Sequence, residues 1–569
     1  MSTSGLQPRG PRAGRAIALT AMTALALSAV LPAWAQTQQG IFVAIGGGPE
    51  RPEIVSTVLQ LAGGKDKHVV VMPTASGAPS ESGLAYKQYF QGAGVQEVDS
   101  LPIPNRDGAN ELEPVKTIGR ADLLYFTGGD QNRLVNTLTN TAVHGSIQTA
   151  WQRAALIAGT SAGAMVWGPE FIANGSSRGA LLNGFSRDAQ GMPGLELRPG
   201  LNLWENLIVD THFTEQQRLG RLVLAVASNQ GYTGLGIDEG TAAIVTHDTI
   251  QAIGVGAVTV LETDKVSASN AETVGPGHPL GIGKITYHRL IPGKTYLRKW
   301  KTIQEDAPLA PAEGQPPRTP YIALAGSDTP PKQSTPISDF VRASGGSQAR
   351  ILLLTGEGAT QGARMWKTHL LRLGAAQVVN YQSIELSEQG LALAIQQATG
   401  IFMLEDGRAS LLKALLANQN RLAQVVIDAG QRMPMGAAGN GVRLFGSHAI
   451  FGAPGSNDYV SLPGLGILPA AAVDKAFWTT DAVERLVRCS IRGQRSLAIG
   501  LSPDNSLTIS GGQATVFGSS QVMFLEAKDV TGFKLAPEES PGPTGITGMA
   551  LSVVPANGSY DFIRREPRF

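Results

Sequence analysis

Short apolar runs, separated by Gly-rich turns and longer mixed segments, make up most of the chain. Uninterrupted apolar strands followed by Gly, Pro, Ser or Thr are typical of parallel sheets with both faces buried. Four runs of the first half fit this description: Ile41–Ile45, Val69–Met72, Leu123–Phe126 and Ala154–Ala158. The intervening segments can form crossover helices. The pattern predicts a doubly wound α/β domain with a mostly parallel sheet, whose ligands lie beyond the carboxyl ends of the strands.

The same alternation of apolar runs, turns and mixed segments begins again after residue 320. Five prolines between Ala307 and Pro320 cannot continue a helix or a central strand, so we interpret residues 304–320 as a semi-rigid linker. Beyond it, four segments match the first half in order: Tyr321–Ala325 matches Phe42–Ile45, Arg350–Leu354 matches His68–Met72, LLRLGAAQVVNY matches YFQGAGVQEVDS, and ATGIFMLEDGRASLLKAL matches ADLLYFTGGDQNRLVNTL. We infer that residues 321–569 are a diverged copy of a first domain at residues 36–303.

The N-terminus has the three parts of a secretory signal peptide. Arginines at the start are followed by an apolar stretch over residues 16–31 and by the small residues Ala33 and Ala35. This order predicts a signal peptide at residues 1–35 that is cleaved after Ala35. Pro32 and the short apolar length argue against a membrane anchor. We therefore expect a secreted protein, periplasmic or extracellular, with no membrane span in the mature chain.

Composition narrows the classes of function. Lys and Arg number 46 against 45 Asp and Glu, and this near balance disfavours a protein that binds nucleic-acid phosphates. Hydrophobic residues make up 42% of the chain, which excludes a wholly disordered protein. Cys489 is the only cysteine, so intramolecular disulfides and zinc sites built on paired cysteines are excluded. We expect no cofactor and no metal.

A candidate nucleophile lies in the segment AALIAGTSAGAMVWG, where Gly159 to Gly163 follow an apolar strand and precede an apparent helix. Small residues on both sides of Ser161 permit a sharp turn that projects its hydroxyl from the strand end. The helix start would add backbone N–H groups for a developing oxyanion. Taken alone the G-x-S-x-G match is weak, because any tight turn that needs small residues gives the same pattern.

A serine nucleophile needs a base and an acid. His212 follows a short apolar run, and Asp238 and Glu239 occupy a turn between two apolar segments. Such a turn can hold a carboxylate against the imidazole and fix its tautomer. A single histidine is more often a surface or core residue, and a turn glutamate is often merely solvated. The order Ser, His, acid also differs from the Ser, acid, His order of α/β-hydrolases.

These segments together resemble the cyanophycinases and related aspartyl dipeptidases. The matching stretches are PTASG at 73–77, TGGDQ at 127–131, GTSAGA at 159–164, DTHF at 210–213 and GIDEGTA at 236–242. The resemblance implies a flavodoxin-like, class I glutamine-amidotransferase-like fold for the first domain. Together with the matched segments it predicts two such domains in tandem. By this resemblance Ser161 is the nucleophile, His212 the general base and Glu239 its acidic partner. The resemblance also implies that Gly129 and Ala162 supply the oxyanion amides, and that the substrate pocket is lined by Gln131, Asp210, Arg218 and Arg221.

The implied function is a secreted serine exopeptidase that hydrolyses cyanophycin to β-aspartyl-arginine dipeptides through an acyl-enzyme on Ser161. Thr211 and Gln216 depart from the family, which often has Gln and Arg there. An exported aspartyl dipeptidase and a non-catalytic polymer-binding protein therefore stay as alternatives. A glutamine amidotransferase is disfavoured, because Ser161 stands where that chemistry needs a thiolate.

The second copy lacks the residues that carry this chemistry. The matched segments set Gly439 opposite Ser161, Ala476 opposite His212 and Pro503 opposite Glu239. We expect a catalytically inactive domain, with a structural role, a polymer-binding role, or the role of a built-in partner in an internal pseudo-dimer. A homodimer is the other assembly that the family resemblance suggests.

Overall fold

The structure is a computed structural model that describes residues 40–304, 317–452, 459–475, 480–492, 497–535 and 542–569. The predicted cleavage site after Ala35, most of the predicted linker, and Ala476 lie outside the described residues. Among the helices that are described, none is long and apolar enough to cross a membrane.

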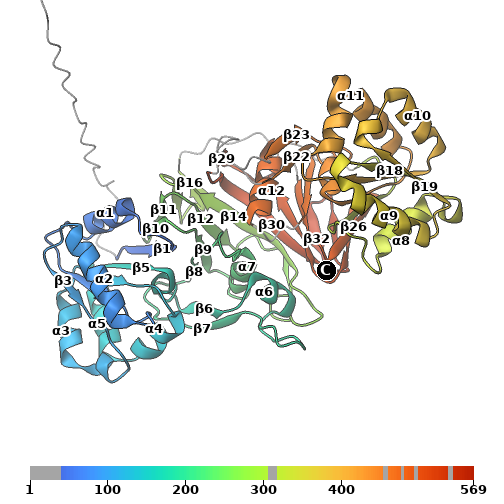
Figure 1. The fold of residues 1–569 in the computed structure, drawn as a ribbon. Coiled ribbons are helices and arrows are strands. Elements are labelled where there is room, and N and C mark those ends of the chain that lie inside the picture. Colours follow the sequence, from blue (N-terminus) through green and yellow to red (C-terminus); the bar gives the residue numbers. More distant parts are fainter. Residues whose placement is uncertain (1–39, 305–316, 453–458, 476–479, 493–496, 536–541) are drawn as a thin grey trace, which may run out of the picture. The chain divides into compact units, whose positions relative to one another are not determined.

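The first half builds a nine-stranded sheet in which five parallel strands are extended by four antiparallel ones (Figure 1). Three of the predicted strands form at the expected residues, and the fourth is shifted by two residues to Leu156–Thr160. In spatial order the strands are β16 (Thr302–Ile303), β15 (Thr295–Leu297), β11 (Thr249–Gly254), β10 (Thr241–Val245), β1 (Phe42–Ile45), β5 (Leu156–Thr160), β4 (Leu123–Phe126), β2 (Val69–Met72) and β3 (Val98–Ser100).

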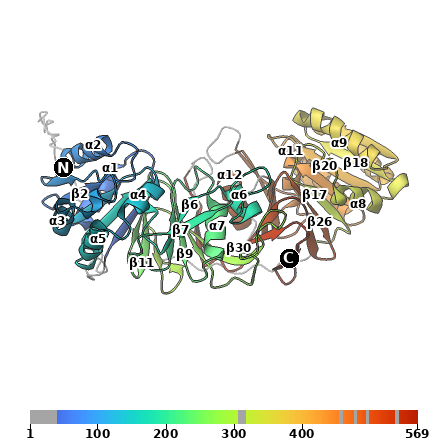
Figure 2. The ribbon, with the colours of Figure 1, turned by 90° about the horizontal axis from the view of Figure 1, so that it is seen from below.

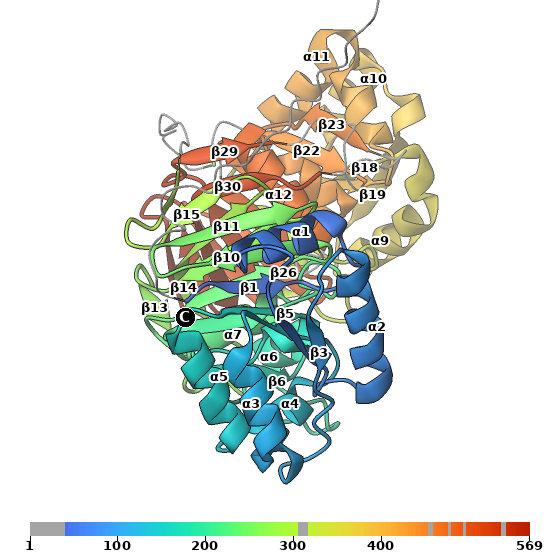
Figure 3. The ribbon, with the colours of Figure 1, turned by 90° about the vertical axis from the view of Figure 1, so that its left-hand side faces the viewer.

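Helices cover both faces of the parallel part (Figure 3). Because successive strand residues point to opposite faces, Tyr125 of β4 meets Phe90 with ring centroids 5.1 Å apart, whereas Phe126 meets Trp167 at 4.5 Å. One face carries α1 (Pro52–Leu61) and α2 (Pro79–Gly92); the other carries α3 (Leu112–Arg120), α4 (Gln131–Leu138) and α5 (Ala142–Gln152). This double cover explains why the strands are apolar throughout, and it leaves their carboxyl ends as the accessible edge.

The second half repeats this strand order. Its sheet runs β19 (Gln377–Gln382), β18 (Arg350–Thr355), β20 (Gly400–Glu405), β21 (Met435–Gly439), β17 (Ile322–Ala325), β26 (Asn505–Ser510), β27 (Gln513–Gly518), β31 (Ser559–Asp561) and β32 (Glu566–Arg568). Again the first five strands are parallel and the rest antiparallel. Its helices are α8 (Thr335–Ala343), α9 (Thr360–Arg372), α10 (Glu388–Gln397) and α11 (Ser410–Gly430). The predicted α/β fold class, with large sheets in more than one domain, is therefore confirmed.

A third sheet, which the sequence did not predict, joins the two halves (Figures 1 and 2). Its order is β24 (Ala471–Lys475), β25 (Leu497–Leu501), β28 (Gln521–Glu526), β30 (Gly545–Pro555), β14 (Ile282–Leu290), β12 (Val258–Glu262), β9 (Thr233–Ile237) and β8 (Leu207–Asp210). The halves meet where β14 and β30 pair antiparallel. A single core contains residues of both halves, among them those of α7 (Leu219–Ala227) and α12 (Thr480–Arg492).

Candidate active site

Ser161 lies at the end of β5, on the turn that the glycine pattern predicted. Its φ of +54° is in the left-handed region, which non-glycine residues seldom occupy. The turn is tight, because a Cβ at Gly159 would stand 2.1 Å from the Gly163 carbonyl oxygen. The expected helix is only one 3-10 turn, Ser161–Ala164. The strained turn presents the hydroxyl at the accessible edge of the sheet.

Three segments that are distant in the sequence bring their side chains together at this edge. Ser161 Oγ lies 2.8 Å from His212 Nε2, and His212 Nδ1 lies 2.7 Å from Glu239 Oε1. His212 follows β8, and Glu239 lies in the turn between β9 and β10. Their side chains are 19% and 33% exposed, so solvent and substrate can reach them. This arrangement can deprotonate a serine and stabilise the resulting imidazolium.

Three glycines that follow β1 and frame the histidine were not among the predicted site residues. The carbonyl oxygen of Gly46 accepts a hydrogen bond from His212 N at 2.8 Å, and that of Gly47 accepts one from Gly240 N at 2.9 Å. A Cβ at Gly47 would stand 2.3 Å from His212 Cε1, and one at Gly48 would stand 2.8 Å from Glu239 Cβ. The available signal was three consecutive glycines at the end of the first predicted strand.

The predicted oxyanion residues lie beside the nucleophile. A Cβ at Gly128 would stand 3.1 Å from Ser161 Cβ, so the Gly128–Gly129 turn after β4 passes close to the serine. Gly129 has a φ of +141°, and a Cβ there would meet the Ala75 carbonyl oxygen. Ala162 directly follows Ser161 and is buried. Backbone N–H groups here would face a developing oxyanion, and this role stays a prediction.

The two neighbouring acids do different work. The buried carboxylate of Asp238 accepts hydrogen bonds from Thr214 N at 3.2 Å and Ala257 N at 3.0 Å, and from the Thr214 hydroxyl. Burial raises the pKa of Asp238 to about 6, although the Arg289 guanidinium at 3.3 Å opposes this shift. Glu239, not Asp238, contacts the imidazole. Asp238 instead connects the loop that carries His212 and Thr214 (the histidine loop) to the turn of residues 238–240 (the acid turn).

Asp210 and Arg221, which were predicted to line the substrate pocket, form a buried ion pair. The Asp210 side chain has no exposed surface. Its Oδ2 accepts from Arg221 Nε at 2.6 Å, and Arg221 also donates to the Gly175 carbonyl oxygen at 2.8 Å. Asp474 of the second half is paired in the same way, with Arg485 Nε at 2.7 Å. Retention in both halves indicates that the pair fastens a helix to a strand end.

Arg218 and Gln131 stay candidates for substrate contact. Arg218 is 17% exposed; it donates to Asp210 Oδ1 at 3.1 Å and to the Thr211 carbonyl oxygen at 2.7 Å. Burial lowers the pKa of Arg218 from its ordinary value. The half-buried Gln131 begins α4, beside the Gly128–Gly129 turn, and its amide nitrogen donates to the Ala173 carbonyl oxygen at 3.0 Å.

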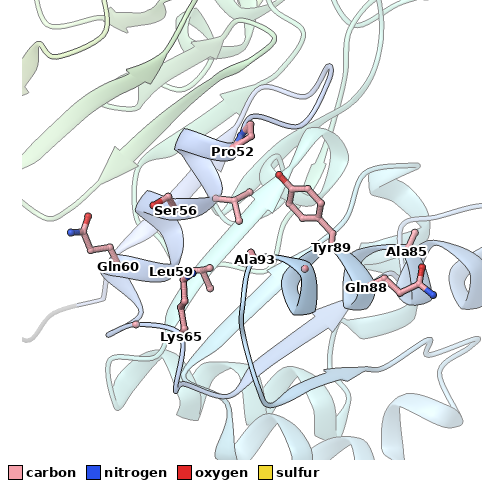
Figure 4. Close-up of a pocket in the computed structure, with 12 residues that line it drawn as sticks. Pro52, Ser56, Leu59, Gln60, Lys65, Ala85, Gln88, Tyr89 and Ala93 are labelled. Atoms are coloured by element: carbon pink, nitrogen blue, oxygen red, sulfur yellow. The ribbon is translucent and has the colours of Figure 1, made fainter. Parts of the chain in front are cut away.

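A separate groove of about 830 Å³ lies between α1 and α2 (Figure 4). Its lining is mostly small or apolar, with Val55, Leu59 and Tyr89 as its larger apolar side chains, and it contains none of the three residues of the serine site. Within the described residues, no group of three or more His, Cys, Asp and Glu side chains could hold a metal ion.

Comparisons with known proteins concern the first half of the chain. Residues 42–253, which include Ser161, His212 and Glu239, match the model of peptidase family S51. The chain is 33% identical over 278 residues to a cyanophycinase of Synechococcus elongatus, which covers 48% of this chain and 84% of that protein. It is 30% identical over 273 residues to a cyanophycinase of Nostoc sp., which covers 47% and 89%.

Among solved structures, a peptidase from an acI-B1 Actinobacterium is 24% identical with a TM-score of 0.33, covering 46% of this chain and 97% of that one. The similarity in sequence therefore spans most of each cyanophycinase and the first half of this chain. The chain belongs to peptidase family S51 and is a serine-type peptidase.

Proposed function

We propose that this peptidase hydrolyses cyanophycin, a poly-aspartate chain with arginine on each β-carboxyl, and releases β-aspartyl-arginine dipeptides. The observation that carries the proposal is the hydrogen-bonded series Ser161, His212 and Glu239, with 2.8 and 2.7 Å contacts, inside the segment that is related to cyanophycinases. An exported dipeptidase for ordinary aspartyl peptides is the second candidate. Thr211 and Gln216, where cyanophycinases often carry Gln and Arg, favour keeping it.

The reaction follows from the geometry in two steps. Ser161 Oγ attacks the scissile carbonyl carbon while His212 Nε2 takes the hydroxyl proton, and Glu239 stabilises the imidazolium through Nδ1–H. The oxyanion is held by the amides of Gly129 and Ala162. His212 then gives the proton to the leaving amine, and the C–N bond breaks. In the second step His212 takes a proton from a water, whose oxygen attacks the acyl carbon. The bond between this carbon and Ser161 Oγ then breaks, and His212 returns the proton to Oγ.

We further propose that the second half does not hydrolyse substrate. Strand registers support the matched positions, because Ile157 pairs with Phe42 as Met435 pairs with Ile322, which sets Gly439 opposite Ser161. Gly439 has the same φ, +54°. A side chain there would meet Asp328, since a Cβ would stand 1.9 Å from its Oδ1. The Asp328 carboxylate, paired with Lys475, thus fills the space that a nucleophile would need.

The N-terminal 35 residues support export of the protein, because they carry the charged, apolar and small-residue parts of a signal peptide. An exported peptidase of this kind suits an organism that feeds on polymer released by other cells. N-terminal sequencing of the mature protein tests this: a chain that begins at Gln36 supports export, and one that begins at Met1 contradicts it.

The activity is tested by incubating the mature protein with cyanophycin and identifying the products by mass. We expect β-aspartyl-arginine, and we expect Ser161→Ala to abolish its release while the melting temperature stays unchanged. Ser327→Ala, in the loop of the second half that corresponds to Gly46–Gly48, is a matched control that should keep full activity. Turnover by Ser161→Ala would remove the proposed nucleophile. Hydrolysis of α-aspartyl dipeptides without cyanophycin turnover would favour the second candidate, and failure of a sulfonyl fluoride to label Ser161 would favour a polymer-binding protein.

A further inference from the structure

Three buried charged side chains connect the second half of the chain to the acid turn of the active site. Glu484 of α12 lies 3.1 Å from Arg289 Nη1, and Asp238 lies 3.3 Å from Arg289 Nη2. Each of these side chains is at most 9% exposed. Arg289 is on β14, the strand that pairs with the second half, so the guanidinium bridges a carboxylate from each half.

Asp238, the member of this series in the first half, contacts the segments that carry His212 and Glu239. Asp238 immediately precedes Glu239, and its Oδ1 accepts from Thr214 N at 3.2 Å. Thr214 is two residues after His212, so one carboxylate holds both the acid turn and the histidine loop. Rotation of Asp238 would release both segments, and the 2.7 Å contact between His212 and Glu239 depends on their relative position.

The second-half end is also fixed. Glu484 Oε1 accepts from Arg488 Nε at 2.8 Å and from the Thr544 hydroxyl, which leaves Oε2 toward Arg289. A buried guanidinium needs counter-charges on the faces it presents. Since Glu484 engages Nη1, Nη2 is directed to Asp238. Val483 of α12 and Thr214 line one small cavity together with Arg289, which shows how close α12 comes to the histidine loop.

The series exists on only one side of the internal repeat. Ile237 pairs with Val258 as Leu501 pairs with Val522, so Ser502 is the counterpart of Asp238. Thr259 pairs with Arg289 as Met523 pairs with Val553, so Val553 is the counterpart of Arg289. The Asp210–Arg221 and Asp474–Arg485 pairs likewise set Gly220 opposite Glu484. The three counterparts, Ser502, Val553 and Gly220, are uncharged. The series Glu484, Arg289 and Asp238 therefore has no equivalent that reaches the turn after β25, and it serves only the half that contains Ser161, His212 and Glu239.

We propose that Glu484 is a positioning residue for catalysis, which acts through Arg289 and Asp238 to hold Glu239 against His212. The second half thereby completes the active site of the first without touching substrate. This inference rests on peptidase activity at Ser161 and not on the identity of the substrate.

The test uses the full mature chain with Glu484→Gln, which keeps the size of the side chain and removes its charge. We expect kcat to fall about ten- to hundredfold with KM unchanged, because a shift of about 1 Å in a catalytic group can cost about a hundredfold. The rate at which a sulfonyl fluoride labels Ser161 should fall in parallel. This second readout does not depend on cyanophycin, so an error in the proposed substrate would leave it intact.

Asp474→Asn is the matched control. It weakens the buried ion pairs that Asp474 makes with Arg443 and with Arg485 of the same helix α12, and Asp474 contacts neither Arg289 nor Asp238. The control therefore separates a general loosening of α12 from the loss of the Glu484 charge. We expect it to lower the melting temperature and leave kcat and the labelling rate as in the wild type. If Glu484→Gln does not fold, Thr544→Val removes one hydrogen bond to Glu484 and should slow both rates about threefold. Unchanged rates in the folded Glu484 or Thr544 variant, or an equal loss of kcat in Asp474→Asn, would overturn the proposal.

Discussion

Gly47→Ala adds one methyl group at the point where the first strand meets the catalytic histidine. In the native backbone this Cβ would lie 2.3 Å from His212 Cε1 and 2.6 Å from Nε2. The second half provides a natural comparison. Gly326, which corresponds to Gly46, is retained, and a Cβ there would stand 2.0 Å from a backbone oxygen, as it would at Gly46. Ser327 takes the position of Gly47 in the second half, where Ala476 stands in the sequence opposite His212.

The size of the effect follows from these distances. To reach an ordinary carbon contact of about 3.5 Å, the imidazole must retreat by about 1 Å. That displacement stretches the 2.8 Å contact with Ser161 beyond hydrogen-bond reach. We expect a loss of about a hundredfold in kcat/KM, or about 2.7 kcal/mol. The φ of +91° at Gly47 adds a backbone cost of about 1–3 kcal/mol in stability.

Steady-state hydrolysis and thermal unfolding separate these two effects. Gly231→Ala is the control, because Gly231 has a φ of +90° and open space around its Cβ position. Both variants should lose similar stability, and only Gly47→Ala should lose activity. A folded Gly47→Ala enzyme whose kcat/KM stays within about threefold of the wild type would show that His212 is not held where the structure places it.

Asp210→Ala and Asp474→Ala should each cost about 3–5 kcal/mol in chemical denaturation, because each leaves buried guanidinium groups without a counter-charge; a loss below about 1 kcal/mol would argue against the pairing. Burial raises the pKa of Glu405 to about 7 from 4.5, so the folded state binds this proton more tightly than the unfolded state does. Stability should therefore fall as the pH rises from 4.5 to about 7. Glu405→Gln should flatten that part of the melting-temperature profile, and an unchanged slope would contradict it. Gly439→Ser in a Ser161→Ala background should restore no hydrolysis, since the new side chain meets Asp328, and any turnover by this double variant above that of Ser161→Ala alone would refute the reasoning.

Strands and turns that depend on neighbouring residues could be predicted from the sequence pattern. The apolar runs at β1, β2 and β4 form strands within one residue of the expected bounds. The turn around Ser161 can be tight because Gly159 and Gly163 carry no side chain. The closeness of Ser161, His212 and Glu239 was predicted through a family resemblance, because no periodicity of the sequence joins segments 51 and 27 residues apart.

Features that depend on distant partners were not predictable in this way. An aspartate beside the catalytic histidine suggests a substrate ligand, and only the packing of α7 shows that Asp210 is buried against Arg221. The third sheet depends on the pairing of Ile285 with Leu551, and an apolar strand pattern names no partner so far along the chain. The role of Asp238 likewise became visible only once Arg289 was placed beside it.

The pairing of β14 with β30 has a consequence for the two halves taken separately. Cut apart, each would expose one strand edge that has lost its partner, on the nine-residue β14 and on the eleven-residue β30. Such an edge is a template for any other extended chain, so either fragment should self-associate or aggregate. Fusion supplies the missing edge at a high effective concentration. If the second half is inactive, as proposed, the strand that it contributes is reason enough for its retention.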